Sequence, residues 1–591
     1  MDCGICQSLM FRFRAVERQT CLAGGCRVLR FAQSHVHTAA TRARRAACPV
    51  AHPATPRRGP RPCSRRRGRS MVGTPAMSAF RSVPGETLLP HDTARRRFFG
   101  DLSFVPRLVA LALPIAGQHL LMTTLNLTDT LMVGQLGEVQ IGAIALGNQV
   151  FFLLMLFLFG VGSGGAVFSS QYWGRRDVAG VRRSMGLSLA LGSGGALVFT
   201  VGGVFFPGLI LSVFTRDPAV IAEGIGYLRI VALSYVFTSI SMGYAHALRS
   251  VGDTRLPLYA TAVSITLNIA GNYVLIFGAL GFPALGVRGA AIATALARLV
   301  ELIVILSVVY HRKGPVAASL RELVRFDRAF AARYFHRALP VIFNEVFWSV
   351  GYTMYTVVFG RMGTSYLAAY TISDTVGRLA LVFFIGTANA SAILIGNRIG
   401  EDAGIEAESL RAPRDETPAV PPGIARDPRD SIAQGIALSL LKILPLIALV
   451  LGAIIFFPVA SWVPYLFAVS DDVRWMVTLL MRAFAFVMIF KIFNMHIIVG
   501  ILRGGGDTHY SLAIDVSFLW LVGVPMAFLT GLVLGLPVHL VYLCIGVEEL
   551  GKMVLGANRI VSGRWINDLT EPVEALHDPV PDASDATGFP L

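Results

Sequence analysis

Between residues 106 and 556 the chain is a succession of apolar stretches, each about 20 residues long or longer. A helix of about 20 residues is long enough to cross the ~30 Å hydrocarbon core of a bilayer. The sequence therefore predicts an all-α integral membrane protein with twelve transmembrane helices. The predicted spans are 108–133, 141–167, 184–206, 225–248, 257–278, 289–310, 338–359, 366–395, 432–457, 475–502, 511–535 and 538–556.

The composition agrees with a membrane protein and argues against nucleic-acid binding. Hydrophobic residues make up 54% of the chain and charged residues only 15%, whereas soluble chains carry about 25% charge. Most of the net charge of +16 lies in the first hundred residues, which hold 19 Arg, no Lys and four acidic residues. A basic segment attached to a nearly neutral apolar body is not a surface for reading DNA. No nucleic-acid partner is expected.

Residues 1–100 are predicted to form a basic, disordered extension, because they show no apolar periodicity and little surface that can be buried. They contain no apolar core followed by a cleavage site, as a secretory signal requires. We interpret them as an upstream extension, with Met71 or Met77 as the true start. An organellar transit peptide and a basic tail on an anionic inner leaflet are the alternatives. The segment holds six of the seven cysteines, so no disulfide framework is expected in the body.

The distribution of Lys and Arg predicts that both termini are cytoplasmic. If the N-terminus is inside, the inner loops hold 21 basic residues and the outer loops hold four. The positive-inside rule favours this orientation, and the even number of helices agrees with it. We expect a multi-pass protein of the plasma membrane, which in a bacterium is the inner membrane.

The chain matches itself at an offset of 226 residues, and further along at an offset of 254. At the first offset Ala112–Pro114 aligns with Ala338–Pro340, and at the second Gly252–Thr254 aligns with Gly506–Thr508. The polar insertion 401–430, expected to be a flexible loop, accounts for the difference. Two six-helix halves that both start inside are parallel repeats about an axis along the membrane normal. Secondary transporters with such repeats place their substrate sites between the halves.

The repeat and the charge pattern divide the chain into five parts. No phosphate-binding loop and no paired His/Glu metal motif is found, so neither an enzyme nor a cofactor is expected. Without a nucleotide-binding domain, an ion gradient is the expected energy source. The predicted parts are a basic extension 1–100, an N-lobe 101–310, a cytoplasmic linker 311–337, a C-lobe 338–556 and a cytoplasmic tail 557–591.

Several stretches resemble the multidrug and toxic compound extrusion (MATE) family, and the resemblance covers roughly residues 100–570. It implies a MATE-like fold and the export of organic, often cationic, compounds in exchange for protons or sodium ions. The matching stretches are LALPIAGQHLLMTTLNLTDTLMVGQLG (111–137), ALRSVGDTRLPLY (247–259), NYVLIFGALGFPALGVRGAAIAT (272–294), LPVIFNEVFWSVG (339–351), LRGGGDTHYSLAIDVSFLW (502–520) and SGRWINDLT (562–570).

The resemblance singles out Asp129. The family commonly carries a carboxylate in its first helix in the pattern D-T-x-M-x-G, which here is Asp129–Gly134. Some members have a second Asp in the fifth helix, four residues after an Asn. Here Asn268 matches that Asn, and Asn272 stands where the Asp would be. A cation site made of two Asp residues in the N-lobe is therefore not supported.

Charged groups inside the spans also mark candidate sites, because each costs about 2.5–3.5 kcal/mol at mid-bilayer. Asp129 has no opposite charge three or four residues away, and its neighbours Asn126, Thr128 and Thr130 are polar. Such an oxygen-rich pocket suits sodium, while a proton needs a carboxylate whose charged form is disfavoured by burial. The sequence leaves both ions open. The candidate cation-coupling residues are Asp129, Glu345 and Asp515, of which Glu345 corresponds to the seventh-helix Glu of other family members.

A second group of polar and aromatic residues is expected to line a substrate cavity. Asp374–Arg378, Glu548–Lys552 and Arg298–Glu301 are spaced as ion pairs on one helix face. Lys491 is interpreted as a counter-ion for Asp515, Glu345 or Asp374. The candidate cavity residues are Gln118, His119, Asn126, Asn268, Asn272, Asn344, Trp348, Tyr352, Asp374 and Lys491.

The repeat suggests a contact between the lobes. At the offset of 226, Gln118-His119 aligns with Asn344-Glu345, which places both pairs at one depth. We hypothesise that His119 and Glu345 approach across the interface in one half of a transport cycle. The simpler interpretation is a satisfied interior His119 and a Glu345 held by Lys491.

Taken as a transporter, the chain is predicted to be a cation-coupled antiporter, driven by H⁺ or Na⁺, that exports organic, cationic drugs or metabolites by alternating access. A flippase for lipids or polysaccharide precursors is the alternative within the same superfamily. It would require a strongly cationic cavity, whereas these spans hold more acids than bases. A channel is a weaker alternative, because no pore loop is found. The expected partners are a small organic substrate and the lipid bilayer, and a monomer is expected.

Overall fold

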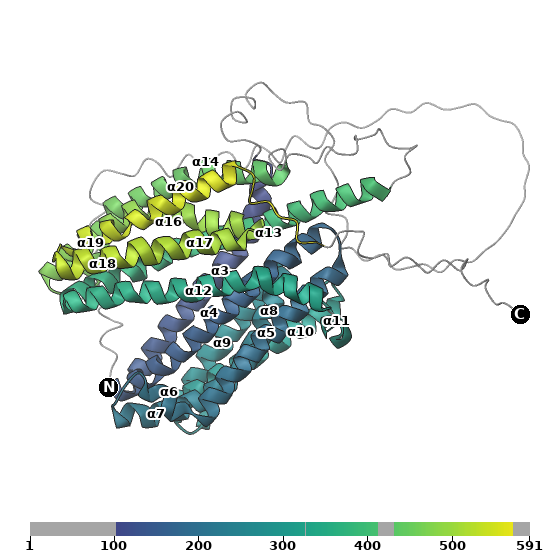
Figure 1. Cartoon of the computed structure of the whole chain (residues 1–591). Helices are drawn as coiled ribbons and strands as arrows, with labels where there is room; N and C mark the ends of the chain where they lie inside the picture. The colour runs from purple at the N-terminus through teal and green to yellow at the C-terminus, as the bar shows by residue number, and fades with distance from the viewer. Residues whose placement is uncertain (1–101, 325–326, 412–430, 468, 571–591) are drawn as a thin grey trace, which may run out of the picture. The chain divides into compact units, whose positions relative to one another are not determined.

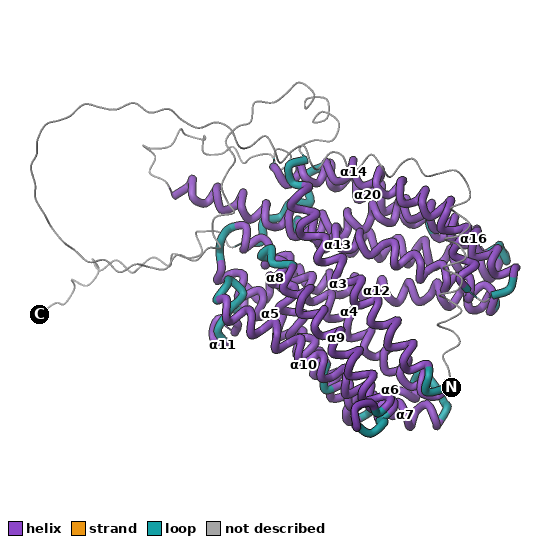
Figure 2. Tube along the Cα trace, turned by 180° about the vertical axis from the view of Figure 1, so that it is seen from behind, coloured by secondary structure: helices purple, strands orange, loops and turns teal. Residues whose placement is uncertain are grey.

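The computed structural model describes residues 102–324, 327–411, 431–467 and 469–570. All regular elements in these ranges are helices (Figures 1 and 2). The expected basic extension, including Met71 and Met77, and the tail from residue 571 lie outside the described residues. The central part of the expected polar loop, residues 412–430, lies outside them as well.

The first half of the described chain forms eight helices and is followed by a short helix that leads into the second half (Figure 1). These helices are α3 (Val105–Gly134), α4 (Glu138–Gly174), α5 (Val178–Phe205), α6 (Pro207–Ser212), α7 (Pro218–Ala232), α8 (Tyr235–Ser250), α9 (Arg255–Phe277) and α10 (Gly286–Arg312), with η1 (Ala279–Gly281) before α10 and α11 (Leu320–Val324) after it.

The second half contains longer helices, several of which include short π-helical or 3₁₀ turns. Its elements are α12 (Arg328–Met362), α13 (Thr364–Arg411), α14 (Ile432–Ile454), η3 (Ile455–Val459), α15 (Ala460–Trp462), η4 (Val463–Leu466), α16 (Asp471–Met495), η5 (His496–Leu502), α17 (Thr508–Phe518), η6 (Leu519–Gly523), α18 (Val524–Phe528), η7 (Leu529–Val533), α19 (Val538–Ile545) and α20 (Val547–Val561).

Each of the twelve predicted spans coincides with a helix or with a run of consecutive helices. Within the described ranges, nine helices are long and apolar enough to cross a membrane, and the pair α7–α8, bent by 45°, makes a tenth. The two remaining predicted spans are α12 and the pair α19–α20. These carry Glu345 in α12 and Glu548, Glu549 and Lys552 in α20. Buried charges also occur in spans that do pass as membrane helices, such as Glu301 in α10 and Asp515 in α17.

Helix α13 continues to Arg411, so the beginning of the expected loop 401–430 is helical. Glu and Ala, which favour helices, are frequent after Gly400. Arg398 also forms ion pairs with Glu401 and Asp402, one helical turn further on. Such pairs at i,i+3 and i,i+4 stabilise an exposed helix end, and they extend α13 beyond the apolar span.

The two lobes meet through the first two helices of each, with α3 packed on α13 and α4 packed on both α12 and α13. The contacts are reciprocal under the offset of 226. A Cβ on Gly174 would lie 1.9 Å from the carbonyl oxygen of Asn397, and one on Gly400 would lie 1.8 Å from that of Gln171. Since 226 residues separate both Gly174 from Gly400 and Gln171 from Asn397, the lobes are related by a pseudo-twofold axis.

A second reciprocal contact lies further along the same helices. A Cβ on Gly160 would lie 2.9 Å from the Cα of Ile342, and one on Gly386 would lie 2.9 Å from the Cβ of Ala116. Glycine lets these helix backbones approach more closely than any other residue would. Gly160, Gly174 and Gly400 lie in the half of α4 or α13 that the charge pattern places toward the cytoplasm, and Gly386 lies next to the midpoint of α13. The close contact between the lobes is therefore at that end.

Candidate functional site

A cavity of about 410 Å³ lies between the lobes, next to the glycine contacts. The N-lobe contributes His119, Thr123 and Phe159, and the C-lobe contributes most of the remaining wall. The polar and aromatic residues that line it are His119, Thr123, Phe159, Asn344, Glu345, Trp348, Tyr352, Arg378, Asn389, Lys491, Asn494, Arg503, Asp515, Glu549 and Lys552.

Two buried ion pairs hold the predicted coupling carboxylates of the C-lobe. The guanidinium of Arg503 lies 2.7 Å from a carboxylate oxygen of Glu345. The ammonium of Lys552 lies 2.9 Å from Asp515, whose other oxygen accepts a hydrogen bond of 2.9 Å from Asn344. All five side chains are buried. Because a charge removed from water is costly unless it is paired, these contacts make the cluster tolerable inside the membrane.

Two further buried carboxylates lie behind this cluster. Lys552 is 3.6 Å from Glu548, so its ammonium is shared between two acids. Asn494 donates a hydrogen bond of 2.7 Å to the carboxylate of Glu549. The predicted Glu548–Lys552 pair is thus present, but the shorter contact of Lys552 is with Asp515.

An aromatic wall lies at the other side of the cavity. The rings of Trp348 and Tyr352 are stacked, with their centroids 5.1 Å apart. The hydroxyl of Tyr352 donates to Asp374 at 2.8 Å, and Arg378 binds the other oxygen of Asp374 at 2.7 Å. Stacked aromatic rings beside a solvent-accessible guanidinium suit a planar organic compound.

The interpretation of Lys491 as a counter-ion for Glu345, Asp515 or Asp374 is wrong. Each of these acids has another basic partner, and among the described residues no carboxylate oxygen lies within 4.0 Å of the Lys491 ammonium. It lies instead 4.9 Å from the centre of the Tyr352 ring, as in a cation–π contact. The three acids form ion pairs with Arg378, Arg503 and Lys552 instead. The spacing of residues in the sequence does not show which of several bases lies closest to each acid.

The structure brings His119 and Glu345 to the same cavity, but no bond between them is present. Glu345 is held by Arg503 and not by Lys491, so that part of the simpler interpretation is also wrong. The Nε2 atom of His119 is buried and has no hydrogen-bond partner within the described part of the chain. A pairing of His119 with Glu345 in another state of the protein stays a prediction.

Asp129 lies in the N-lobe and is not among the residues that line the large cavity. Asn272 donates a hydrogen bond of 2.7 Å to its carboxylate and one of 3.0 Å to Asn268, which in turn donates to Thr294. The Thr128 hydroxyl donates to the carbonyl oxygen of Thr124 and so does not serve Asp129. The side chains of Asn126 and Thr130 lie outside the described residues.

A second polar chain crosses the N-lobe from Arg249 to Glu301. Arg249 donates to Gln118 at 2.6 Å, Gln118 donates to Thr261 at 2.8 Å, and Thr261 donates to Glu301 at 2.7 Å. Arg298 completes the chain, 2.9 Å from Glu301, as its spacing predicts. Gln118 is thus a structural link of this chain and not a residue of the large cavity.

This chain has a counterpart in the C-lobe with the opposite charges. The offsets of 226 and 254 relate Gln118 to Asn344 and Thr261 to Asp515, and both pairs are hydrogen-bonded. Where Thr261 meets the acid Glu301, Asp515 meets the base Lys552. The two lobes thus share the Gln118–Thr261 and Asn344–Asp515 hydrogen bonds, but the next group is an acid, Glu301, in the N-lobe and a base, Lys552, in the C-lobe.

The sequence analysis did not single out Arg249 and Arg503 as site residues, and it treated Lys552 only as a helix-face partner of Glu548. The offset of 254, which aligns Arg249 with Arg503, is the signal that identifies them as a related pair. Both are buried at helix ends, which a count of apolar residues does not detect. Within the described ranges, no group of three or more His, Cys, Asp or Glu residues is arranged to hold a metal ion.

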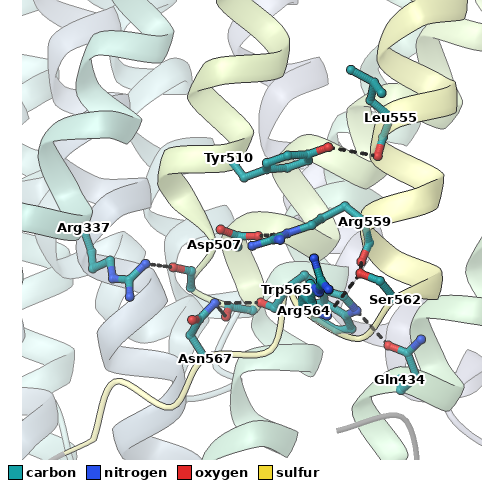
Figure 3. A network of polar contacts seen from close by, with 12 residues as sticks. Arg337, Gln434, Asp507, Tyr510, Leu555, Arg559, Ser562, Arg564, Trp565 and Asn567 are labelled. Atoms are coloured by element: carbon teal, nitrogen blue, oxygen red, sulfur yellow. Dashed lines mark hydrogen bonds and ion pairs between the residues drawn. The ribbon is translucent and has the colours of Figure 1, made fainter.

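The segment after α20 is here called the strap (Gly563–Thr570), and Figure 3 shows two of its residues, Trp565 and Asn567, bonded to neighbouring groups. Trp565 is fully buried, and its indole donates to Gln434 of α14 at 2.7 Å. The backbone N–H of Asn567 donates to the carbonyl oxygen of Gly505. On the same side, Arg559 binds Asp507 at 2.8 Å. These contacts fix the strap to the C-lobe.

The strap also contacts the N-lobe. Gln171 of α4 donates to the carbonyl oxygen of Asn567 at 3.0 Å and accepts from the N–H of Leu569 at 2.8 Å. Arg175 donates to the hydroxyl of Thr570. The strap therefore bridges α4 of one lobe and the α14 and η5–α17 region of the other.

Replacement of Gln171 by Leu is expected to lower the free energy of unfolding by about 1–3 kcal/mol. The change leaves the buried carbonyl of Asn567 and the N–H of Leu569 without their partner, and unpaired polar groups of this kind cost about that much. The melting temperature of the purified full chain measures the effect. Replacement of Thr124 by Val, which removes a hydroxyl bonded only within its own helix, is the control and should leave the melting temperature nearly unchanged.

Comparisons with known proteins agree with this architecture. The profile of the MatE family matches residues 114–274 and 340–406, and the second range corresponds at the offset of 226 to residues 114–180 of the first. The "Probable multidrug resistance protein NorM" of Rhizobium meliloti (strain 1021) is 35% identical over 298 residues, covering 49% of this chain and 62% of that protein. The chain thus spans less than two thirds of that relative. The "Uncharacterized transporter YisQ" of Bacillus subtilis (strain 168) is 24% identical over 78% of this chain and 94% of that protein.

Two solved structures show the same fold. The MATE transporter VcmN of Vibrio cholerae in its bent form has a TM-score of 0.66 and 16% identity, covering 79% of this chain and 99% of its own. A MOP superfamily transporter from Pyrococcus furiosus has a TM-score of 0.63 and 22% identity, covering 78% and 96%. The chain is therefore similar to the MatE family over part of each lobe, and its two-lobe fold is that of these solved transporters.

Proposed function

We propose that the protein is a cation-coupled antiporter that exports organic compounds by alternating access. The observation that carries this proposal is the cavity of about 410 Å³ between two pseudo-symmetric lobes, which are in close contact at one end of it. Separation of the lobes at that end and their approach at the other would expose the cavity to the opposite side of the membrane. The names of the relatives, which include multidrug resistance proteins, support this activity.

The cavity wall favours planar organic substrates. The stacked rings of Trp348 and Tyr352 supply an apolar face, and the carboxylates Glu345, Asp515 and Glu549 lie nearby. Glu345 and Asp515 are paired with Arg503 and Lys552. An organic cation would therefore find aromatic faces and one lining carboxylate, that of Glu549, without a paired base among the described residues. The positions of the aromatic rings on α12 therefore support the export of cationic aromatic compounds.

Asp129 is the best candidate for the coupling ion, which is H⁺ or Na⁺. No Lys or Arg nitrogen of the described residues lies within 4.0 Å of its carboxylate, which is bonded to an amide. Glu345 and Asp515, by contrast, are already neutralised by Arg503 and Lys552. A carboxylate in a membrane without a paired base gains most from binding a cation and can release it again.

The Asp129→Asn variant is expected to lose coupled efflux entirely while it still reaches the membrane. An amide never carries the charge that binds and releases the coupling cation, whereas the packing around it is nearly unchanged. The measurement is efflux of a fluorescent aromatic cation from vesicles containing the reconstituted protein, with sodium and pH gradients imposed separately. The gradient that drives the wild-type protein identifies the ion.

Asp217→Asn is the matched control for this experiment. Asp217 caps the N-terminus of α7 from an exposed position, and Asn caps helices about equally well. This variant should transport as the wild type does. Wild-type transport by Asp129→Asn, over the whole range of pH and sodium, would remove Asp129 from the mechanism.

The proposal places the protein in the cytoplasmic (inner) membrane of a bacterium, as a monomer with both termini in the cytoplasm. The charge pattern of the loops supports this orientation. Fusion of a reporter that is active only in the cytoplasm to each end would test it.

A further inference from the structure

A second, much smaller cavity of about 30 Å³ lies in the lobe interface, next to the large one. Both lobes contribute corresponding residues to its wall. Ser163 and Asn389 are related by the offset of 226, and Arg249 and Arg503 by the offset of 254. The small cavity therefore lies close to the pseudo-twofold axis, where each lobe presents an arginine to the other.

The charges around this cavity do not balance. None of the residues that line it is acidic. Arg503 shares its charge with Glu345, but no carboxylate oxygen of the described residues lies within 4.0 Å of Arg249. The hydrogen-bond partner of Arg249 is the neutral amide oxygen of Gln118. Of the two buried guanidinium groups, only that of Arg503 has a carboxylate of the described residues beside it. The positive charge of Arg249 is buried without a counter-ion from this part of the chain, which is unfavourable.

Three hydrogen-bonding groups at the cavity also lack partners. The Nε atoms of Arg249 and Arg503 and the Nε2 atom of His246 are buried and have no hydrogen-bond partner among the described residues. The exposed fractions of these residues are 8% for Arg249, 2% for Arg503 and 6% for His246. Buried donors normally find an acceptor in the protein, in ordered water or in an ion. Both arginines are cationic donors, so an acceptor that carries negative charge satisfies them best.

We propose that this small cavity binds a monatomic anion, chloride in a cell, between Arg249 of the N-lobe and Arg503 of the C-lobe. The space exceeds the ~10–15 Å³ that a single water needs, but it is too small for an organic acid or a nucleotide. The anion supplies the missing negative charge and an acceptor for both guanidinium groups.

The position of the site gives the anion a role in lobe contact. Arg249 and Arg503 approach each other only because the lobes touch at this end. If the lobes separate there, the cavity divides and the anion loses half of its ligands. Chloride therefore stabilises the arrangement with this end closed, whichever compound the protein transports.

The test is the melting temperature of the purified full chain in chloride and in gluconate at equal ionic strength. Gluconate is too large for the cavity, so it is the reference anion. Chloride and bromide are expected to raise the melting temperature by roughly 2–4 °C in a saturable manner, as a ligand specific for the folded state does. A crystal grown in bromide should show anomalous scattering between Arg249 and Arg503.

Two variants separate anion binding from a general salt effect. Arg249→Met removes one ligand, and Ser163→Leu fills the cavity while keeping both arginines. Either should abolish the difference between chloride and gluconate, and Ser163→Leu decides the question if Arg249→Met does not fold. Arg312→Met, a change at an exposed arginine, should retain it. Equal melting temperatures in the two salts, or a chloride effect that persists in Ser163→Leu, would show that water fills the cavity and would overturn the proposal.

Discussion

Replacement of Gly400 by Ala is expected to push the lobes apart where they touch. A thiol buried in that contact should then react with a reagent from water at least about tenfold faster. The added Cβ would lie 1.8 Å from the carbonyl oxygen of Gln171, which is far shorter than any contact between non-bonded atoms. The obstacle is helix backbone on the other lobe and not a flexible side chain, so a rotamer change cannot relieve it. The lobes must move apart at the end that the charge pattern predicts to be cytoplasmic.

Labelling of a cysteine at position 170 in an otherwise cysteine-free chain measures this movement. Ser170 is 1% exposed and faces Gly396 of α13, so a thiol there reacts slowly with a polar maleimide while the lobes touch. Labelling should become at least about tenfold faster in the Gly400→Ala background. An increase in accessibility of that size corresponds to about 1.4 kcal/mol lost from the closed contact.

The pseudo-twofold axis makes a second, independent form of this prediction. Gly174→Ala places a Cβ 1.9 Å from the carbonyl oxygen of Asn397, the counterpart of Gln171, and should accelerate labelling to a similar degree. Gly435→Ala is the control, because a Cβ at Gly435 meets no atom within 4 Å. Unchanged labelling in both interface variants would mean that the lobes do not have to touch at these glycines.

The repeat in the sequence predicted the two-lobe architecture, because duplication leaves both hydrophobic patterns and glycine positions related by a constant offset. Gly174 and Gly400 are aligned at 226, and the structure shows them in equivalent contacts. The spacing of Asp374 and Arg378 also predicted their ion pair, since partners four residues apart on one helix are close whatever the tertiary structure.

Partners on different helices were not predictable in the same way. Lys491 was assigned to acids that are bonded instead to Arg503, Lys552 and Arg378. Those choices depend on the rotation of each helix about its axis and on side-chain length, which periodicity does not determine. The inverted polarity of the two lobes was likewise hidden, because Glu301 and Lys552 do not align at either offset.

Replacement of Lys552 by Met is expected to lower the free energy of unfolding by about 3–5 kcal/mol. Lys552 is 3% exposed and is the only basic group of the described residues within 4.0 Å of either Asp515 or Glu548. Its removal leaves two buried carboxylates without a counter-charge. Loss of one partner of a buried ion pair costs about 3–5 kcal/mol for this reason.

The melting temperature and the resistance to unfolding in a denaturing detergent measure the loss. Arg378→Met is the matched control, since it also removes a base from a helix-face pair in the same cavity. The Arg378 side chain is 65% exposed, so water screens its interaction with Asp374 and the Asp374 charge that remains after the substitution. That pair therefore contributes only about 0–1 kcal/mol to the free energy of unfolding.

A double variant identifies the cause of the instability. In Lys552→Met with Asp515→Asn, the uncompensated charge at position 515 is absent, and the Asn344 amide still has an oxygen to bind. The double variant should therefore be more stable than Lys552→Met alone, a non-additive result that requires the two residues to interact. Additive losses would mean that Asp515 is neutral in the folded protein and that the ammonium of Lys552 serves Glu548 instead. In that case the buried cluster would already contain a bound proton, and Asp515 would join Asp129 as a carboxylate able to carry the coupling ion.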